Sequence, residues 1–262
     1  MTAMTDLIRP APGLRVLITG GAGGIGRRIA EGFLDAGASV HVSDVDQDAL
    51  DDFASRGGPR SGAICDARDL AATDAFFAQA RETLGGIDIA IANAGIAGPT
   101  GPVDRIDAEG WDATLEICLR SAWRLAHLAA PDLRANAGLF VGISSAAGRF
   151  GFPNRTPYAA AKWGMIGLVK SLAMELGPDG ARANAILPGI VDGPRQDRVI
   201  AARAQTEGRG AAEVREGLVA RTSMRRMVTQ DEIAGAILYL ASPLGSAISG
   251  QAIAVDAGLE VL

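Results

Sequence analysis

Two polar residues in the second half of the chain have types and spacing that suit proton transfer. Tyr158 and Lys162 are four residues apart in a segment with helical hydrophobic spacing, so both side chains should lie on one helix face. Tyrosine is a poor base near neutral pH because its ordinary pKa is about 10, but a nearby ammonium group favours the phenolate. Lowering that pKa by about three units requires roughly 4 kcal/mol of differential stabilisation. A core tyrosine beside a surface lysine is the alternative interpretation.

A hydroxyl group precedes this pair. Ser145 follows an expected strand at 139–143 and stands 13 residues before Tyr158. Ligands of open α/β sheets bind at the carboxyl ends of the strands. A hydroxyl at that place can donate a hydrogen bond to a substrate carbonyl or alkoxide. Ser144, the adjacent residue, is the alternative donor.

A glycine-rich stretch, TGGAGGIG at 19–26, separates an expected strand at 15–19 from a helical repeat that Gly37 ends. Glycine lets backbone approach a ligand closely, and a helix N-terminus offers free N–H groups and the positive end of a dipole. In the first strand–helix unit these features predict a cradle for a pyrophosphate. A tight turn that binds nothing is the alternative. The candidate binding residues are Gly20, Gly24, Ile25 and Gly26.

Asp44 follows the expected second strand at 39–43. A carboxylate there accepts hydrogen bonds from both hydroxyls of an adenosine ribose and repels a 2′-phosphate. Val45 rather than an arginine comes next, and Gly23 rather than a basic residue precedes Gly24. These residues favour NAD over NADP as the cofactor. Alternatively, Asp44 caps the expected helix at 46–53, although Asp46 is also placed to do so.

Strand-like runs and helical repeats alternate along the whole chain. This alternation predicts an α/β fold: a single-domain doubly wound parallel sheet, Rossmann-like, with helices on both faces, over residues 1–262. The main expected helices are at 70–84, 111–130 and 157–176, with another that begins at a Thr229–Glu232 capping box. The remaining expected strands are at 62–65, 87–92, 181–187 and 252–255.

The composition argues against several classes of protein. The 262 residues carry 25 basic and 30 acidic side chains, a formal charge of −5, which argues against a nucleic-acid partner. Two cysteines cannot form a disulfide framework, and no cluster of residues suggests a metal site. No apolar run reaches the length of a membrane span, and residues 1–12 lack the pattern of a secretory signal. We therefore expect a cytoplasmic protein with no membrane partner.

Further short motifs accompany these residues: CDARD at 65–69, ANAG at 92–95, ISS at 143–145, YAAAK at 158–162 and LPG at 187–189. With TGGAGGIG and Asp44 they span nearly the whole chain, about residues 13–259. With this set the chain resembles the short-chain dehydrogenase/reductase family, in particular its NAD-preferring members with the one-domain architecture.

The resemblance implies an enzyme that moves hydride between a nicotinamide and a small-molecule secondary alcohol or ketone. In that family Tyr158 would be the general acid/base, Lys162 would hold the nicotinamide ribose, and Ser145 would orient the substrate oxygen. The family commonly forms tetramers through its long helices, so a homotetramer is expected. The further cofactor contacts that the resemblance implies are Asp66 at the adenine, Asn93 and Gly95 on the adenosine side, and Pro188, Gly189 and Val191 toward the nicotinamide.

The chain departs from the family pattern at two positions. The family usually has an asparagine 40 residues before the tyrosine, where it helps to hold a water that relays protons to the lysine. Here that position is Cys118, and a thiol is a weak hydrogen-bonding group. Gly193 stands where many relatives have a threonine that touches the nicotinamide amide, a contact that no glycine side chain can make.

Residues 193–228 interrupt the alternation where the family has its substrate-binding helices, so we expect a helical substrate lid there. The segment carries eight arginines and four acidic residues, a local charge of +4. Arginine suits a carboxylate, sulfonate or phosphate, so the substrate is a candidate anion, with Arg149, Arg155 and Arg195 as its candidate contacts. A solvated helix with its own salt bridges is the alternative.

An NAD-dependent dehydrogenase of a secondary alcohol, or a ketone reductase in reverse, is the leading functional hypothesis. A ketoacyl-thioester reductase is the enzymatic alternative, and Asp44 argues against it because such reductases generally use NADPH. A non-catalytic NAD(H)-binding sensor is the third possibility. Only Cys118 favours it, and the presence of Tyr158 and Lys162 argues against it.

Overall fold

Every strand expected from the sequence forms, and all seven join one parallel sheet. The computed structural model describes residues 4–259, so the ends of the expected 1–262 domain lie outside the described residues. The order of the strands is β3-β2-β1-β4-β5-β6-β7. The strands are β1 (Arg15–Thr19), β2 (Ser39–Asp44), β3 (Arg60–Ile64), β4 (Ile89–Ala92), β5 (Leu139–Ile143), β6 (Arg182–Pro188) and β7 (Ala252–Val255).

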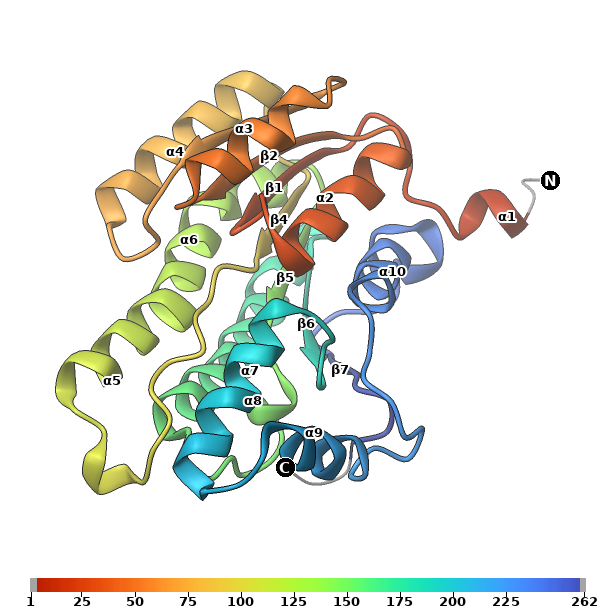
Figure 1. Ribbon diagram of the computed structural model, residues 1–262. Helices are drawn as coiled ribbons and strands as arrows, with labels where there is room; N and C mark the ends of the chain where they lie inside the picture. The colour runs from red at the N-terminus through yellow and green to blue at the C-terminus, as the bar shows by residue number, and fades with distance from the viewer. Residues whose placement is uncertain (1–3, 260–262) are drawn as a thin grey trace.

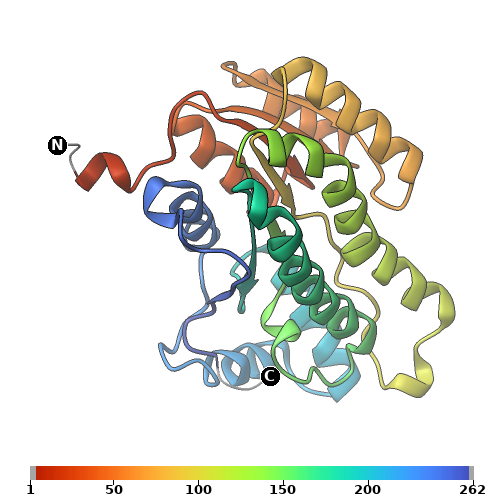
Figure 2. The same cartoon turned by 180° about the vertical axis from the view of Figure 1, so that it is seen from behind.

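Helices cover both faces of this sheet, as Figures 1 and 2 show from opposite sides. The helices are α1 (Met4–Leu7), α2 (Gly24–Asp35), α3 (Gln47–Ser55), α4 (Leu70–Leu84), α5 (Ala108–Leu115), α6 (Ser121–Ala135), α7 (Thr156–Leu176), α8 (Pro194–Glu207), α9 (Ala211–Val219) and α10 (Gln230–Ala241). None of the described helices is both long and apolar enough to cross a membrane.

The alternation of side chains along the strands divides the core into two layers. Val16 and Ile18 of β1 pack with α2, α3 and α10, whereas Leu17 between them packs with α4, α6 and α7. Successive side chains of a strand point to opposite faces, so a strand buried on both sides reads as a continuous apolar run. The expected doubly wound architecture is therefore confirmed.

Local capping decides several helix starts. Asp46 caps α3 by accepting a hydrogen bond from the Ala49 N–H at 3.1 Å, which leaves the neighbouring Asp44 free of that role. Thr229 and Glu232 form the expected capping box at the start of α10.

The helix expected at 111–130 has other bounds and is interrupted. Asp107 caps α5, so the helix begins earlier, and a π-helical segment at Glu116–Arg120 joins α5 to α6. The helix then continues through Pro131 to Ala135. Its last turn buries Leu133 in the core and pairs Asp132 with Arg81 at 3.0 Å, and this packing outweighs the helix-breaking tendency of the proline.

The segment expected as a lid, 193–228, contains the two helices α8 and α9. They pack on each other through a small apolar cluster that includes Ile200, Ala204, Val214 and Leu218. The cluster also contains Ala146, just beyond β5, and thus joins the lid to the sheet edge at which the strands end. In Figure 1 these helices lie below the carboxyl ends of β5 and β6.

Candidate active site

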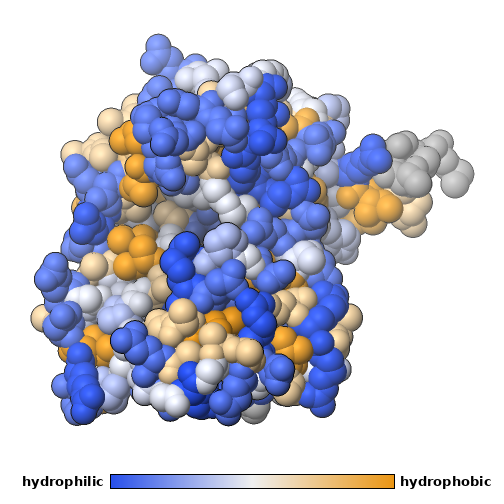
Figure 3. Space-filling model, in the orientation of Figure 1, coloured by the Kyte–Doolittle hydropathy of each residue, from blue (hydrophilic) through white to orange (hydrophobic). Residues whose placement is uncertain are grey.

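A cavity of about 580 Å³ runs along the carboxyl ends of the strands. It crosses the point between β1 and β4 where the strand order reverses, the usual ligand site of open α/β sheets. Figure 3 shows the molecule hollowed between the part that carries α2–α4 and the part that carries α8 and α9. At one end the cavity is lined by the glycine-rich loop and Asp44, and at the other by Tyr158 and the first turns of α8.

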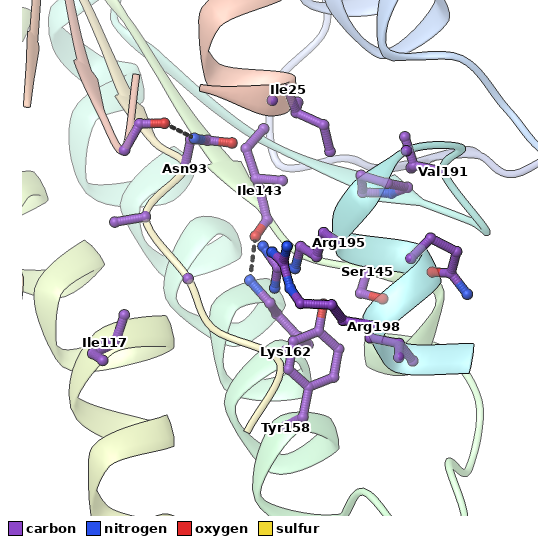
Figure 4. A pocket seen from close by; sticks show the side chains of 18 of the residues that line it. Ile25, Asn93, Ile117, Ile143, Ser145, Tyr158, Lys162, Val191, Arg195 and Arg198 are labelled. Carbon is purple, nitrogen blue, oxygen red and sulfur yellow. Dashed lines mark hydrogen bonds between the residues drawn. The ribbon is translucent and has the colours of Figure 1, made fainter. Parts of the chain in front are cut away.

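Ser145, Tyr158 and Lys162 converge on this cavity from two elements (Figure 4). Tyr158 and Lys162 belong to α7, and Ser145 follows β5. The Lys162 side chain is buried, its Nζ donates a hydrogen bond to the Ile143 carbonyl at 2.7 Å, and Nζ lies 5.6 Å from the centroid of the Tyr158 ring. The expected helix face thus places an ammonium group beside the phenol.

The surroundings of Tyr158 favour its phenolate. Burial raises the pKa of the phenol, but the positive charges of Lys162 and Arg195 and a hydrogen bond with Ser145 lower it. The balance holds the pKa of Tyr158 below its ordinary value of 10. The site therefore contains a phenol that can take and return a proton at a pH closer to neutral than an ordinary tyrosine can.

The two adjacent serines have different environments. Ser144 is buried, and its Oγ donates a hydrogen bond to the Lys162 carbonyl at 2.7 Å, which ties β5 to α7. Ser145 is half-buried, lines the cavity, and its Oγ accepts a hydrogen bond from the Ala147 N–H at 3.1 Å. Both serines line the cavity, but the Ser144 hydroxyl is engaged with Lys162, which leaves Ser145 as the better placed donor to a substrate oxygen.

The glycines of the first loop have two different structural roles, lining the cavity and packing the loop on α2. Gly20 and Gly24 have φ of +61° and +53°, a region that favours glycine, and both line the cavity together with Ile25. Gly26 does not line it. A Cβ at Gly26 would lie 2.2 Å from the Gly20 carbonyl oxygen, so this glycine lets the loop pack on α2. The tight packing gives position 26 its own structural requirement for glycine, and its expected contact with a cofactor stays a prediction.

Asn93 also supports this loop. Its Nδ2 donates hydrogen bonds to the carbonyls of Thr19 at 3.1 Å and Gly20 at 2.7 Å. The side chain lines the cavity as expected, but its amide is already engaged in holding β4 to the glycine-rich turn.

The two acidic residues expected near the adenosine both line the cavity. Asp44 accepts hydrogen bonds from the backbone N–H groups of Ala22 at 3.1 Å and Val45 at 2.9 Å. Asp66 pairs with Arg68 at 2.9 Å, and hydrogen bonds from Arg68 hold the pKa of that carboxyl below its usual range. The other expected cofactor residues that line the cavity are Gly95, Pro188, Gly189 and Val191.

Only two of the three arginines expected at the substrate line the cavity. Arg155 and Arg195 line the cavity. Arg149 is not among the lining residues, because the short helical turn after Ser145 directs its guanidinium over the Phe150 ring, 4.9 Å from the centroid. Arg198 and Arg203 also line the cavity and were missed as individual contacts. Their spacing from Arg195 on an expected helix was the available signal.

Cys118 lies in the π-helical segment close to this site. It is fully buried, and its Sγ donates a long hydrogen bond, 3.5 Å, to the Ile96 carbonyl. A Cβ built on Gly95 would lie 3.5 Å from that sulfur and 3.6 Å from Lys162 Nζ, so Gly95 separates the two groups. Gly193, the other departure, has a φ of +138° and forms the N-cap of α8.

Comparison with known proteins agrees with this architecture. Residues 20–260 match the family model described as enoyl-(acyl carrier protein) reductase. The chain is 32% identical over 251 residues to a 3-oxoacyl-[acyl-carrier-protein] reductase of Thermotoga maritima, covering 94% of this chain and 97% of the relative. It is 34% identical over 251 residues to a cis-4-hydroxycyclohexanecarboxylate dehydrogenase of Sinomonas cyclohexanicum, covering 92% and 94%.

Among solved structures, levodione reductase superposes with a TM-score of 0.89 at 28% identity, covering 95% of this chain and 98% of that one. Members of this group are oxidoreductases that bind a nicotinamide cofactor. The matches extend over nearly the whole chain, in sequence as well as in fold. The protein therefore belongs to the short-chain dehydrogenase/reductase family.

Proposed function

We propose that the protein is an NAD-dependent dehydrogenase that oxidises a small-molecule secondary alcohol, or reduces the corresponding ketone. The convergence of Ser145, Tyr158 and Lys162 on one cavity, with the pKa of Tyr158 held below its ordinary value, carries this proposal. We also propose that residues 1–262 act as one domain, with 193–228 as the substrate lid.

In this proposal each side chain has one task. Ser145 donates a hydrogen bond to the substrate oxygen and orients it toward Tyr158 Oη. In the oxidation direction the Tyr158 phenolate takes the hydroxyl proton, and in reduction the phenol returns it. Lys162 stabilises the phenolate and would hold the ribose of a bound nicotinamide cofactor. The nicotinamide supplies the two-electron acceptor or donor for the reacting carbon.

The cavity suits a dinucleotide. Gly23 and Gly24 line the cavity at the N-terminus of α2, where a pyrophosphate is favoured, and a Cβ at either would meet nothing within 4 Å. Asp44 supports NAD rather than NADP, because its carboxylate would accept from the ribose hydroxyls and repel a 2′-phosphate. The exposed Val45 beside it offers no positive charge for such a phosphate.

The substrate and the assembly are parts of the same proposal. Arginines line the lid end of the cavity, and one relative is named for a carboxylate-bearing alcohol, which together support an anionic substrate. Exposed tryptophans support a homotetramer through the long helices, since such side chains are enriched in protein interfaces. They are Trp111, Trp123 and Trp163, on α5, α6 and α7.

A ketoacyl-thioester reductase is the second candidate function. The 32% identity to the Thermotoga maritima reductase favours it. The acidic Asp44 opposes it if that reaction requires NADPH, so the cofactor preference separates the two candidates.

The test is formation of reduced nicotinamide from NAD over a panel of neutral and anionic secondary alcohols. Tyr158→Phe should lower kcat about 1000-fold while NADH binding, followed by fluorescence, is retained. Tyr239→Phe is the matched control, because Tyr239 is exposed on α10. If wild-type protein binds NADH but oxidises or reduces nothing in the panel, the proposal is overturned and a binding protein remains.

A further inference from the structure

Arg155 is a buried cation at the N-terminus of α7, three residues before Tyr158. Only 5% of the residue is exposed, although it lines the cavity. Its guanidinium carbon lies 4.9 Å from the centroid of the Tyr158 ring and 5.2 Å from that of Phe152. One nitrogen, Nη2, donates to the Ala97 carbonyl. The positive charge is thus held against the proposed proton-transfer residue.

This charge has no acidic partner within the described part of the chain. No ion pair joins Arg155 to a carboxylate there, and its buried Nε has no hydrogen-bond partner. Burial lowers the pKa of the guanidinium, the negative charge of an ionised Tyr158 raises it, and the nearby charges of Arg195 and Arg203 lower it, so that the net shift is downward. An unpaired buried cation is costly, so a bound anion would stabilise this arrangement.

Arg155 differs from the arginines of the lid in its burial. Arg195 and Arg198 also line the cavity without an ion pair among the described residues, but both are exposed to solvent. Several other lid arginines have acidic partners. Arg203 pairs with Glu207 at 2.5 Å, and Arg226 pairs with Glu232 at 2.6 Å. Arg215 pairs with Asp197 and lies 3.6 Å from Asp192. These are the salt bridges of an ordinary solvated helix. Arg155 lies instead among aromatic rings at the reacting end of the cavity.

We propose that Arg155 binds the carboxylate of the substrate and thereby selects hydroxy acids, or their oxo acids, over neutral alcohols. This inference rests on the proposed dehydrogenase function and adds the substrate class. A planar guanidinium matches a carboxylate through two parallel hydrogen bonds, and the apolar neighbours strengthen that pairing. Because Arg155 contacts the Tyr158 ring, the carboxylate would sit near the carbon that is oxidised. The carboxylate itself does not react; only the hydroxyl-bearing carbon is oxidised, to a carbonyl carbon.

The first experiment measures binding without turnover. The NADH-bound protein is titrated calorimetrically with cyclohexanecarboxylate, with cyclohexanecarboxamide, which has nearly the same shape without the charge, and with inorganic phosphate. We expect wild-type protein to bind the carboxylate at least 10-fold more tightly than the amide. Equal affinities, or a preference for phosphate over the carboxylate, would overturn the inference.

Variants assign the preference to one residue. Arg155→Gln should abolish the preference for the carboxylate, and Arg155→Lys, which keeps the charge but loses the planar fork, should reduce it in part. Arg221→Gln is the matched control, because it removes the same charge from an exposed residue of the lid that does not line the cavity. A preference that persists in Arg155→Gln assigns the anion to another group and overturns the inference. If that variant loses NADH binding through misfolding, the wild-type affinity ratio and the Arg155→Lys variant decide.

Turnover distinguishes this inference from the function on which it rests. For a hydroxy acid and its methyl ester, Arg155→Gln should lower kcat/KM about 100-fold for the acid and less than about 3-fold for the ester. Turnover of neutral alcohols with no preference for acids would refute the role of Arg155 and leave the dehydrogenase proposal standing. Tight carboxylate binding with no turnover of any alcohol would support the role of Arg155 and refute the dehydrogenase proposal.

Discussion

Lys162 Nζ lies 5.6 Å from the centroid of the Tyr158 ring while it donates a hydrogen bond to the carbonyl of Ile143. This arrangement holds a buried ammonium group beside the phenol and fixes it to β5. The charge therefore acts on Tyr158 from a constant position, which links the sheet to the chemistry proposed for α7.

The pH dependence of alcohol oxidation tests this relationship. The rate should rise with pH and level off above the pKa of Tyr158, because the phenolate is the base. In Lys162→Met that pKa rises, so the midpoint should move to higher pH and the rate at pH 7 should fall at least 100-fold. Lys170→Met, on the exposed side of the same helix, should keep the wild-type profile. An unchanged midpoint in Lys162→Met would contradict this account.

Asp44 should control the choice of cofactor. Replacement of both Asp44 and Val45, by Ala and Arg respectively, removes the repulsion of a 2′-phosphate and supplies a cation for it. We expect the ratio of kcat/KM for NAD over NADP to exceed about 100 in the wild type and to fall below one in the double variant. Asp48→Ala, an exposed acidic residue in the first turn of α3, serves as the control. A wild-type preference for NADP would refute the ribose role of Asp44.

Alanine substitutions at Gly26 and Gly23 distinguish a packing role of the glycine-rich loop from its contact with the cofactor. In Gly26→Ala the new methyl group would lie 2.2 Å from the Gly20 carbonyl oxygen and 2.5 Å from Asn93 Nδ2. We expect a loss of about 3 kcal/mol in the free energy of unfolding, measured by urea denaturation. Gly23→Ala meets nothing within 4 Å, so it should keep its stability and affect only NADH affinity. Equal stability of the two variants would show that the loop relaxes around the methyl group.

His41 should make stability depend on pH. It is buried on β2, its Nδ1 lies 2.7 Å from Ser61 Oγ, and burial lowers its pKa to about 4. The unfolded chain binds the proton near pH 6.5, so stability is full above that pH and falls as the pH drops toward 4. Between pH 7 and 4 this histidine should account for about 3 kcal/mol of unfolding free energy.

The measurement compares urea unfolding of the wild type and His41→Gln across that pH range. The difference between their slopes isolates His41 from the carboxylates, which titrate in both proteins. Parallel pH dependence in the two proteins would show that His41 has the same pKa in the folded and unfolded chain, and would contradict the lowering by burial.

Much of the fold follows from patterns that are local in the chain. The apolar runs predicted all seven strands, and Thr229 with Glu232 predicted the start of α10. The helix expected at 111–130 was wrong in its bounds, because the burial of Leu133 carries α6 past Pro131. Local propensity does not contain that packing.

The candidate site, too, was predicted only in part from the sequence. The spacing of Tyr158 and Lys162 was enough to place them on one helix face, and the position of Ser145 after β5 brought it to the same edge of the sheet. Neither Gly26 nor Arg149 reaches the cavity, since the first packs beneath the loop and the second turns toward Phe150.

The sequence by itself therefore determined the order of elements, the glycine-rich turn and the types of groups at the ends of the strands, because periodicity and turn chemistry act over a few residues. Only the tertiary structure decided which of two adjacent serine hydroxyls is engaged by Lys162 and which arginines have acidic partners. Those outcomes depend on contacts such as that of Ser144 with Lys162, and on the burial of Arg155 against Tyr158. Contacts of this kind join segments that are distant in the chain or set rotamers by packing, and no local pattern records them.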